Sequence, residues 1–221
     1  MSFKHNAAGR SGLQFFGKIT ASISHEIRNV FAVLNENAGL MEDLILLGEK
    51  GMPVDQARLK ALAQSMGQQI RRGDGIVENM NRFAHEVDHP VKEIELNETL
   101  GLLIALSGRL AKMRGVTIDP VGEEEIMIAT NAFFLENLLW SIMEFAMEAV
   151  GKDKTLTIVS HASERGVQIR FQGLENLPQI PSDGFPSALE QALLASLEAD
   201  FSINSSSEDI ILTLPKKIEA A

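Results

Sequence analysis

The sequence predicts an α+β protein in which a long antiparallel helical hairpin, dimerising into a four-helix bundle, precedes an α/β sandwich. Two observations predict this order. Apolar residues recur at helical spacing over residues 11–90, with a break near Gly51 and Pro53. Beyond residue 90, apolar and polar residues alternate in several short segments, as is typical of strands. We therefore expect a flexible tail at residues 1–10, a helical hairpin at 11–90 and an α/β domain at 91–221.

The first helix is predicted over residues 11–49, which contain no proline. Its apolar residues are separated by steps of 7, 4, 3, 4, 7 and 3, a heptad pattern whose two gaps fall at Thr20 and Asn37. One face of this helix is therefore expected to pack against a partner helix. The apolar positions are Phe16, Ile23, Ile27, Val30, Leu34, Met41 and Leu44.

The second helix is predicted from Asp55, whose side chain can cap it, to His85, and Pro90 prevents its continuation. Two helices joined by a short turn form an antiparallel hairpin. Because a hairpin is only two helices thick, its apolar stripes stay partly exposed unless a second copy covers them, so we expect a homodimer. The stripe of the second helix comprises Leu59, Leu62, Met66, Ile70, Gly73, Ile76 or Val77, Met80 and Phe83.

Residues 91–221 show the patterns of short strands and amphipathic helices in turn. Asn97 is the expected cap of the first of these helices. Helices grouped against a mostly antiparallel sheet make an α/β sandwich. The predicted strands are 92–96, 116–121, 125–130, 155–161, 166–172, 201–205 and 209–215, and the predicted helices are 97–114, 131–150 and 187–200.

The composition excludes several classes of function. The chain has no cysteine, which excludes disulfides, thiol catalysis and thiolate metal sites. No apolar run approaches the roughly 20 residues of a membrane span, and the N-terminus lacks the apolar stretch of a signal peptide, so we expect a cytoplasmic protein. The net charge of −10 arises beyond residue 90, because residues 1–90 carry 10 basic and 10 acidic groups. Such an acidic chain is unsuited to binding nucleic acid.

His25 is the candidate nucleophile of the sequence. It falls at the heptad position farthest from the apolar seam, so its side chain is expected to project into solvent. Glu26 lies beside it, and Asn29 lies one turn further along the same exposed side. An exposed imidazole is a competent nucleophile, and a neighbouring carboxylate can fix its tautomer and accept its proton. A surface histidine with a chance acidic neighbour would show the same local pattern.

The wider stretch Ile-Ser-His-Glu-Ile-Arg-Asn-Val-Phe-Ala-Val-Leu at residues 23–34 resembles the H-box of sensor histidine kinases. That family's pattern is Ser/Ala-His-Glu-Leu/Ile-Arg-Asn/Thr-Pro-Leu, and Val30 stands where the family has proline. The resemblance implies that His25 accepts a phosphoryl group with Glu26 as base, and that the hairpin dimerises. It also implies that Glu26 and Asn29 match the family's phosphatase motif, in which the amide orients a water against a receiver's phospho-aspartate.

Residues 91–221 resemble the ATPase domain of these kinases in the order of their elements and in the closing Leu-Thr-Leu-Pro of residues 212–215. Within that resemblance, Ser141 and Phe145 replace two asparagines of the N-box, and Gly173 replaces the aspartate that reads adenine. Phenylalanine offers no oxygen to a magnesium ion. Glu175 replaces a glycine, and residues 174–186 are short for an ATP lid. The resemblance therefore implies a degenerate ATPase domain that binds no nucleotide and has no cofactor of its own.

Basic residues near the level of His25 are expected to form the surface that a partner binds. Receiver domains are acidic around their aspartate, so a locally basic bundle favours docking. An ordinary solvated helix surface would have the same composition. Two glycines in the second helix, Gly73 and Gly75, cost about 1 kcal/mol each relative to alanine, and either a partner's approach or close helix packing would explain them. The basic residues are Lys18, Arg28, Arg71 and Arg72.

A second string, His85-Glu-Val-Asp-His89, matches the His-Glu-x-x-His pattern by which zinc proteases place two ligands on one helical face. Pro90 follows at once, so the helix is expected to end between or at these residues. We therefore expect a polar helix end here, and no metal site.

These observations predict a histidine phosphotransferase of a phosphorelay, which passes a phosphoryl group between receiver aspartates through His25 without ATP, the receiver supplying its own magnesium. Three alternatives stay open. One is a receiver phosphatase that uses Glu26 and Asn29, another is a non-catalytic pseudokinase that binds receivers, and the last is an active sensor histidine kinase. Replacing His25 by alanine separates the phosphorelay from the phosphatase. The substitution should abolish the relay, whereas dephosphorylation of a receiver need not pass through the imidazole.

Overall fold

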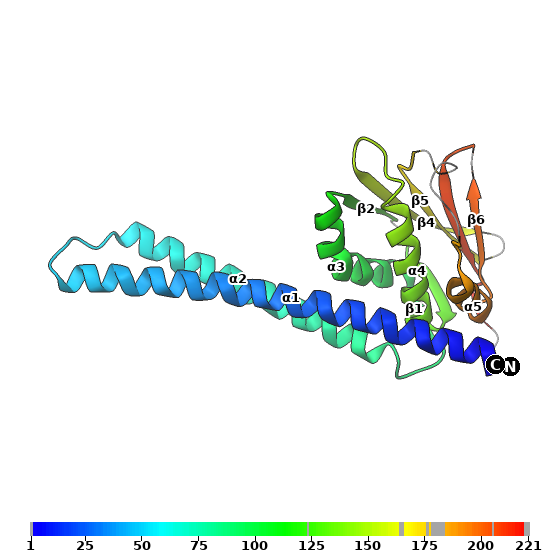
Figure 1. The fold of residues 1–221 in the computed structure, drawn as a ribbon, viewed down its shortest axis with the longest axis horizontal. Coiled ribbons are helices and arrows are strands. Elements are labelled where there is room, and N and C mark those ends of the chain that lie inside the picture. Colours follow the sequence, from blue (N-terminus) through cyan, green and yellow to red (C-terminus); the bar gives the residue numbers. More distant parts are fainter. Residues whose placement is uncertain are drawn as a thin grey trace. The chain divides into compact units, whose positions relative to one another are not determined.

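The computed structural model describes residues 2–122, 124–163, 166–175, 177, 184–204 and 206–218, with side chains from residue 9 onward. The chain divides into two compact units. The hairpin unit is Thr20–Arg82, and the α/β unit is Met1–Ile19 together with Phe83–Ala221. Helices α1 (Ser2–Glu49) and α2 (Gln56–His85) each contribute to both units (Figure 1).

Helix α1 begins at Ser2 and not near Ser11, so residues 2–10 are helical where the sequence predicted a tail. The reason is tertiary packing further along the same helix. Phe15 and Ile19 are 2% and 0% exposed within the α/β unit. Once these turns are fixed, each residue added at the N-terminal end gains a backbone hydrogen bond without a new nucleation cost.

The core of the hairpin unit follows the predicted heptad seam. Ile23, Val30 and Leu44 of α1 are buried, as is Leu62 of α2. The polar gap at Asn37 is also buried, and its Nδ2 donates to Ser65 Oγ at 2.9 Å. A buried amide that finds its partner across the seam favours one register of the two helices.

The start of α2 and its glycine have local explanations. Asp55 caps the helix as predicted, because its Oδ1 accepts hydrogen bonds from the backbone N–H groups of Ala57 at 2.9 Å and Arg58 at 3.1 Å. A Cβ placed on Gly73 would lie 3.4 Å from Val30 Cγ1. This distance favours close helix packing as the explanation of Gly73.

The α/β unit contains two sheets. Strand β1 (Lys92–Glu95) pairs with β3 (Met127–Thr130) in an antiparallel ribbon. The larger sheet has the order β2-β4-β5-β7-β6, with β2 parallel to β4 and every other pair antiparallel. Its strands are β2 (Thr117–Val121), β4 (Thr155–Ser163), β5 (Gly166–Gln172), β6 (Asp200–Asn204) and β7 (Asp209–Leu214).

Three helices, α3 (Leu96–Arg114), α4 (Ala132–Ala146) and α5 (Ala188–Ser196), complete the unit. Along the central strands, buried residues alternate with half-buried ones, as in Leu156, Ile158 and Ser160 of β4. This alternation means that one face of the sheet is covered, and the three helices lie together on that face (Figure 1). The prediction of an α+β chain with a helix-covered, mostly antiparallel sheet is confirmed for the described residues.

The cap of α3 differs from the prediction. Glu95, and not Asn97, is the N-cap, and its Oε2 accepts from the backbone N–H of Glu98 at 2.6 Å. Burial alone would raise the pKa of Glu95, but hydrogen bonds from backbone N–H groups, those of Ile126 and Glu98 among them, outweigh it and lower that pKa. Asn97 instead donates to the carbonyl of Glu124 and accepts from the Ser160 hydroxyl.

Across the described residues, no helix has the length and apolar character that a membrane crossing needs.

Candidate functional site

His25 lies in the middle of α1, in the hairpin unit, with its side chain exposed. The seam residues on either side explain this position. Ile23 and Val30 are 6% and 3% exposed and face α2, which turns the helix so that position 25 points to solvent. A macromolecule can therefore reach the imidazole from outside, and the described residues do not enclose it.

The neighbours of His25 differ from the expected pairing. Asn29 Nδ2 lies 3.3 Å from His25 Nδ1, one helical turn away. The Glu26 carboxylate lies instead 3.6 Å from the Arg72 guanidinium of α2, with 20% of the Glu26 side chain exposed. The group in contact with the imidazole is thus the amide, and the carboxylate is held by a cation on the facing helix.

The basic residues predicted to bind a partner fall into two groups. Arg28 and Arg71 are exposed in the hairpin unit, and neither has a carboxylate within ion-pair distance among the described residues. Arg72 is also half exposed, but it is paired with Glu26. Lys18 belongs to the α/β unit, where its Nζ lies 2.6 Å from Glu144 Oε2. The structure therefore gives Lys18 a partner within its own chain.

The two positions that the sequence resemblance matches to N-box asparagines lie on α4. Ser141 is half-buried, and Phe145 is 9% exposed. The Phe145 ring stacks on Phe185, with centroids 4.5 Å apart and an interplanar angle of 6°, and Phe185 meets the edge of Phe201 at 5.5 Å. Three aromatic rings therefore occupy the surroundings of a position that would need an oxygen to hold magnesium.

Gly173, which the sequence resemblance matches to an adenine-reading aspartate, lies where the backbone is closely approached by another strand. Its φ is +82°, and a Cβ built on it would lie 2.4 Å from the carbonyl oxygen of Thr155. Its own carbonyl accepts from the backbone N–H of Gly151 at 3.0 Å. Only glycine fits this combination of conformation and space. Of the stretch predicted to be too short for an ATP lid, residues 176 and 178–183 lie outside the described residues.

Replacing Gly173 by aspartate is expected to destabilise the α/β unit by about 2–4 kcal/mol, through a left-handed backbone conformation and a collision with Thr155. Urea unfolding followed by the fluorescence of Trp140, the single tryptophan, measures this loss. The control is Gly75→Asp, because no atom lies within 4 Å of a Cβ at that helical position. Equal stability of wild type and Gly173→Asp would show that an aspartate can be accommodated here.

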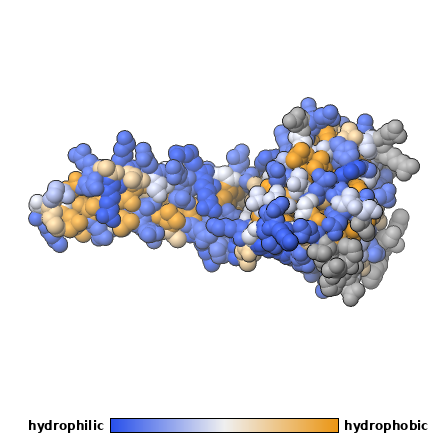
Figure 2. Space-filling view, turned by 90° about the horizontal axis from the view of Figure 1, so that it is seen from above, coloured by the Kyte–Doolittle hydropathy of each residue, from blue (hydrophilic) through white to orange (hydrophobic). Residues whose placement is uncertain are grey.

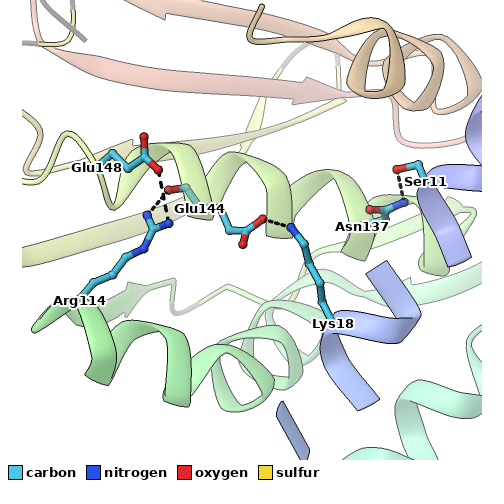
Figure 3. A network of polar contacts seen from close by, with 6 residues as sticks. All are labelled: Ser11, Lys18, Arg114, Asn137, Glu144 and Glu148. Carbon is cyan, nitrogen blue, oxygen red and sulfur yellow. Dashed lines mark hydrogen bonds and ion pairs between the residues drawn. The ribbon is translucent and has the colours of Figure 1, made fainter. Parts of the chain in front are cut away.

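The N-terminal part of α1 packs on α4 within the α/β unit through polar contacts that Figure 3 shows. Asn137 Nδ2 donates to Ser11 Oγ at 3.0 Å, and both residues are buried. Further along, the Lys18–Glu144 ion pair joins the same two helices, and Arg114 of α3 donates to the backbone carbonyl of Glu144 at 2.6 Å. These residues hold α1 along the side of α4 that carries Ser141.

A cavity of about 350 Å³ remains between these elements, and Ser141 and Phe145 line it. Both cations in its wall are paired with glutamates, Lys18 with Glu144 and Arg114 with Glu148. The cavity therefore presents little uncompensated positive charge to a polyphosphate.

The sequence did not lead us to predict that the N-terminal part of α1 packs on α4. The residue that could have indicated it is Gly12, because a Cβ there would lie 2.8 Å from the Phe133 ring and force the ring to move.

His85 and His89 do not lie on one helical face. Helix α2 ends at His85, and His89 lies beyond it in the connection to β1. His85 Nδ1 lies instead 2.8 Å from Asp88 Oδ2. Within the described residues, no three histidine, aspartate or glutamate side chains gather closely enough to hold a metal ion.

No protein-family model matches the chain, and no curated protein matches it. Among solved structures, the chain is similar to the catalytic domain of histidine kinase ThkA, at 14% identity and a TM-score of 0.47 over 58% of this chain and 97% of that chain. It is similar to a bacterial phosphotransferase at 13% identity and a TM-score of 0.47, over 90% of this chain and 95% of that chain. Histidine kinase AdeS of Acinetobacter baumannii is similar at 10% identity and a TM-score of 0.42, over 81% of this chain and 93% of that chain.

Proposed function

We propose that this protein is a histidine phosphotransferase that relays a phosphoryl group between the aspartates of receiver domains through His25, without using ATP. The observation that carries the proposal is the exposed imidazole in the middle of a long helix, with a polar neighbour at Nδ1 and with no enclosing pocket among the described residues. Such a nucleophile suits a protein substrate whose acyl phosphate is itself presented on a surface.

The chemistry requires little from the chain beyond positioning. A nitrogen of His25 forms a bond to phosphorus while the bond from phosphorus to the aspartate oxygen breaks, and the carboxylate leaves with the bonding electron pair. The reverse step on a second receiver returns the imidazole. The receiver's own magnesium neutralises the phosphoryl charge, so the phosphotransferase brings no cofactor.

The absence of an ATP-dependent step is supported by the α/β unit. Phe145 and its stacked partner Phe185 place apolar rings where magnesium coordination would need an oxygen, and Gly173 excludes an aspartate by its conformation. The cations that line the neighbouring cavity are already paired. The aromatic rings and the paired cations belong to one cavity, Gly173 is a separate position, and each of these features opposes nucleotide binding.

Arg71 and Arg72 are the cations that we propose for receiver docking, whereas Arg28 lines the groove beside Phe31 and Ile70. Arg71 and Arg72 are exposed in the hairpin unit, and Arg72 contacts the residue that follows His25 in the sequence. Receivers present carboxylates around their phosphorylated aspartate, so a local basic surface increases the rate of productive encounter. Lys18, also expected from the sequence to bind a partner, lies in the α/β unit, where Glu144 is its ion-pair partner.

The hairpin unit is proposed to act as a homodimer. Phe31, Ile70 and Val77 are 62%, 53% and 45% exposed, and the groove beside Phe31 and Ile70 is also lined by Leu34 and Met66. Figure 2 shows apolar side chains among the hydrophilic ones on the surface. A second hairpin laid against this face would complete a four-helix bundle and cover the stripe.

Replacing Ile70 by glutamate is expected to convert the dimer to a monomer, because a charge would be buried at the centre of the proposed helix interface. Sedimentation equilibrium over a range of protein concentrations measures the change. Met113→Glu is the control, since Met113 is 70% exposed on α3 and should leave the assembly unchanged. A monomeric wild type would refute the dimer.

The relay itself is tested with two receivers. A receiver carrying labelled acyl phosphate is mixed with an unlabelled second receiver, in the presence and absence of this protein. The proposal predicts that label reaches the second receiver only when the protein is present and His25 is intact. Label released as free phosphate, with none on the protein, would favour the phosphatase, and binding without any loss of label would favour the pseudokinase.

A further inference from the structure

The cavity beside Ser141 and Phe145 is lined by residues of the α/β unit alone, and the proposed transfer makes no use of it. Its volume of about 350 Å³ is within the range of pockets that hold small molecules. Three glutamates, one lysine and one arginine line it, so its wall has a formal charge of −1. These charged residues are Glu144, Glu148, Glu190, Lys18 and Arg114.

Each of the two cations in the wall has a glutamate partner (Figure 3). Lys18 Nζ lies 2.6 Å from Glu144 Oε2, and Arg114 Nη2 lies 3.4 Å from Glu148 Oε1. Each pair uses only one oxygen of its carboxylate. The other oxygens, Glu144 Oε1 and Glu148 Oε2, have no hydrogen-bond partner among the described residues. A ligand that carries N–H groups therefore finds acceptors on this side of the cavity.

The helix ends at the cavity also favour positive charge. Glu144 and Phe145 lie in the last turn of α4, which contains no basic residue. The carbonyl groups at the C-terminal end of a helix attract cations. Helix α5 begins at the opposite wall, but Ser187 and Glu190 form a capping box there, and Glu190 Oε2 accepts from the backbone N–H of Ser187 at 2.9 Å. The chain's own carboxylate therefore compensates the positive end of α5.

Four aromatic side chains supply the apolar part of the wall. An aromatic ring attracts an organic cation through its quadrupole and covers the alkyl part of the molecule. Within the part of the chain that the structure describes, the carboxylates do not gather closely enough to hold a metal ion. Rings and carboxylates together thus suit an organic ammonium better than a polyphosphate or a bare metal. The aromatic residues are Phe15, Trp140, Phe145 and Phe185.

We propose that this cavity binds a small aliphatic diamine or polyamine. Its ammonium groups contact the carboxylates at the end of α4 and at Glu190 of α5, and its alkyl chain lies against the aromatic rings. Two ammonium groups are proposed because carboxylates occur at both helix ends. The inference goes beyond the proposed transfer and does not depend on it, since His25 belongs to the hairpin unit. The ligand of the α/β unit would have a charge opposite to that of a nucleotide.

The test is calorimetric titration of the full chain with 1,4-diaminobutane, at about 0.15 M salt to screen remote charges. We expect one saturable site per chain with a Kd below about 1 mM. Glu148→Gln should weaken binding by roughly four- to tenfold, through loss of one nearby charge. Lys18→Gln should tighten it by a similar factor, because Glu144 loses its partner. Both side chains are more than half exposed, at 57% and 54%, so both variants are expected to fold.

The matched control is Glu93→Gln, which removes the same charge from an exposed position on β1 and should leave the Kd unchanged within about twofold. An equal loss of affinity in Glu93→Gln and Glu148→Gln would indicate unspecific attraction to an acidic chain and overturn the proposal. Weaker binding in Lys18→Gln, tighter binding of ATP than of the diamine, or no saturable binding of the diamine would overturn it as well.

Discussion

Replacing His25 by alanine is expected to abolish transfer of label from a phosphorylated receiver to this protein. The imidazole is the only group that the proposal allows to form a bond to phosphorus, so no residual transfer is expected. The side chain is exposed, so the substitution should change the free energy of unfolding by less than about 0.5 kcal/mol. The measurement is labelling of the purified variant, with its fold verified by circular dichroism.

The matched control for this experiment is His85→Ala, because His85 is also an exposed histidine on a helix of the same chain and is paired with Asp88. We expect it to accept label as wild type does. The label on wild type should be lost in acid and survive base, as phosphohistidine does. Label that persists in His25→Ala would place the acceptor on another residue.

Replacing Phe83 by alanine is expected to cost about 3–5 kcal/mol of stability in the α/β unit, the usual range for a buried phenylalanine. Phe83 is 2% exposed, although it lies two residues before the end of α2. Its ring meets Phe15 edge-on at 5.3 Å, stacks on Phe16 at 5.7 Å and lies 6.0 Å from Phe133. The substitution would leave a cavity at the point where both long helices join the unit.

Trp140 reports this loss directly, because its ring lies 5.9 Å from Phe15 in the same cluster. Urea unfolding of Phe83→Ala is compared with that of Phe16→Ala, a variant of the same chemistry at a side chain that is 42% exposed. The Phe16 variant is expected to lose clearly less. If the two variants lose the same amount, or if Phe83→Ala loses under about 1 kcal/mol, the helix ends are not part of the core.

Most of the fold can be predicted from local patterns in the sequence. The alternation at Thr157–His161 and Gly166–Gln172 predicts strands β4 and β5 because one face of each is covered by helices. Asp55 predicts the start of α2 because the cap needs only the side chain and the next three residues. Asn131 likewise caps α4, accepting from the backbone N–H of Phe134 at 2.8 Å.

The predictions differ from the structure where contacts between residues distant in sequence determine the bounds or the cap of a helix. Residues 2–10 continue a helix whose Phe15 packs against Trp140, 125 positions away, and a local sequence pattern does not reveal such a contact. The N-cap of α3 is Glu95 and not the predicted Asn97. The Glu95 carboxylate also accepts a hydrogen bond from the backbone N–H of Ile126, which is distant in sequence.

At the candidate site, too, the sequence predicts local positions but not contacts between the two helices. The sequence places His25, Glu26 and Asn29 on the exposed side of one helix, because the heptad fixes the orientation of each residue. It does not predict that Arg72, 46 positions away, holds the Glu26 carboxylate. Sequence spacing therefore predicts which groups are near the nucleophile, whereas the facing helix decides which of them contacts it.

The most direct measurement of the central claim compares two phosphoryl donors. The purified protein is incubated with labelled ATP and magnesium in one reaction and with a labelled acyl-phosphorylated receiver in the other. We expect label on His25 from the receiver and none from ATP. Label from ATP would contradict it, because the aromatic stack at Phe145 and the backbone at Gly173 would then have to admit a nucleotide.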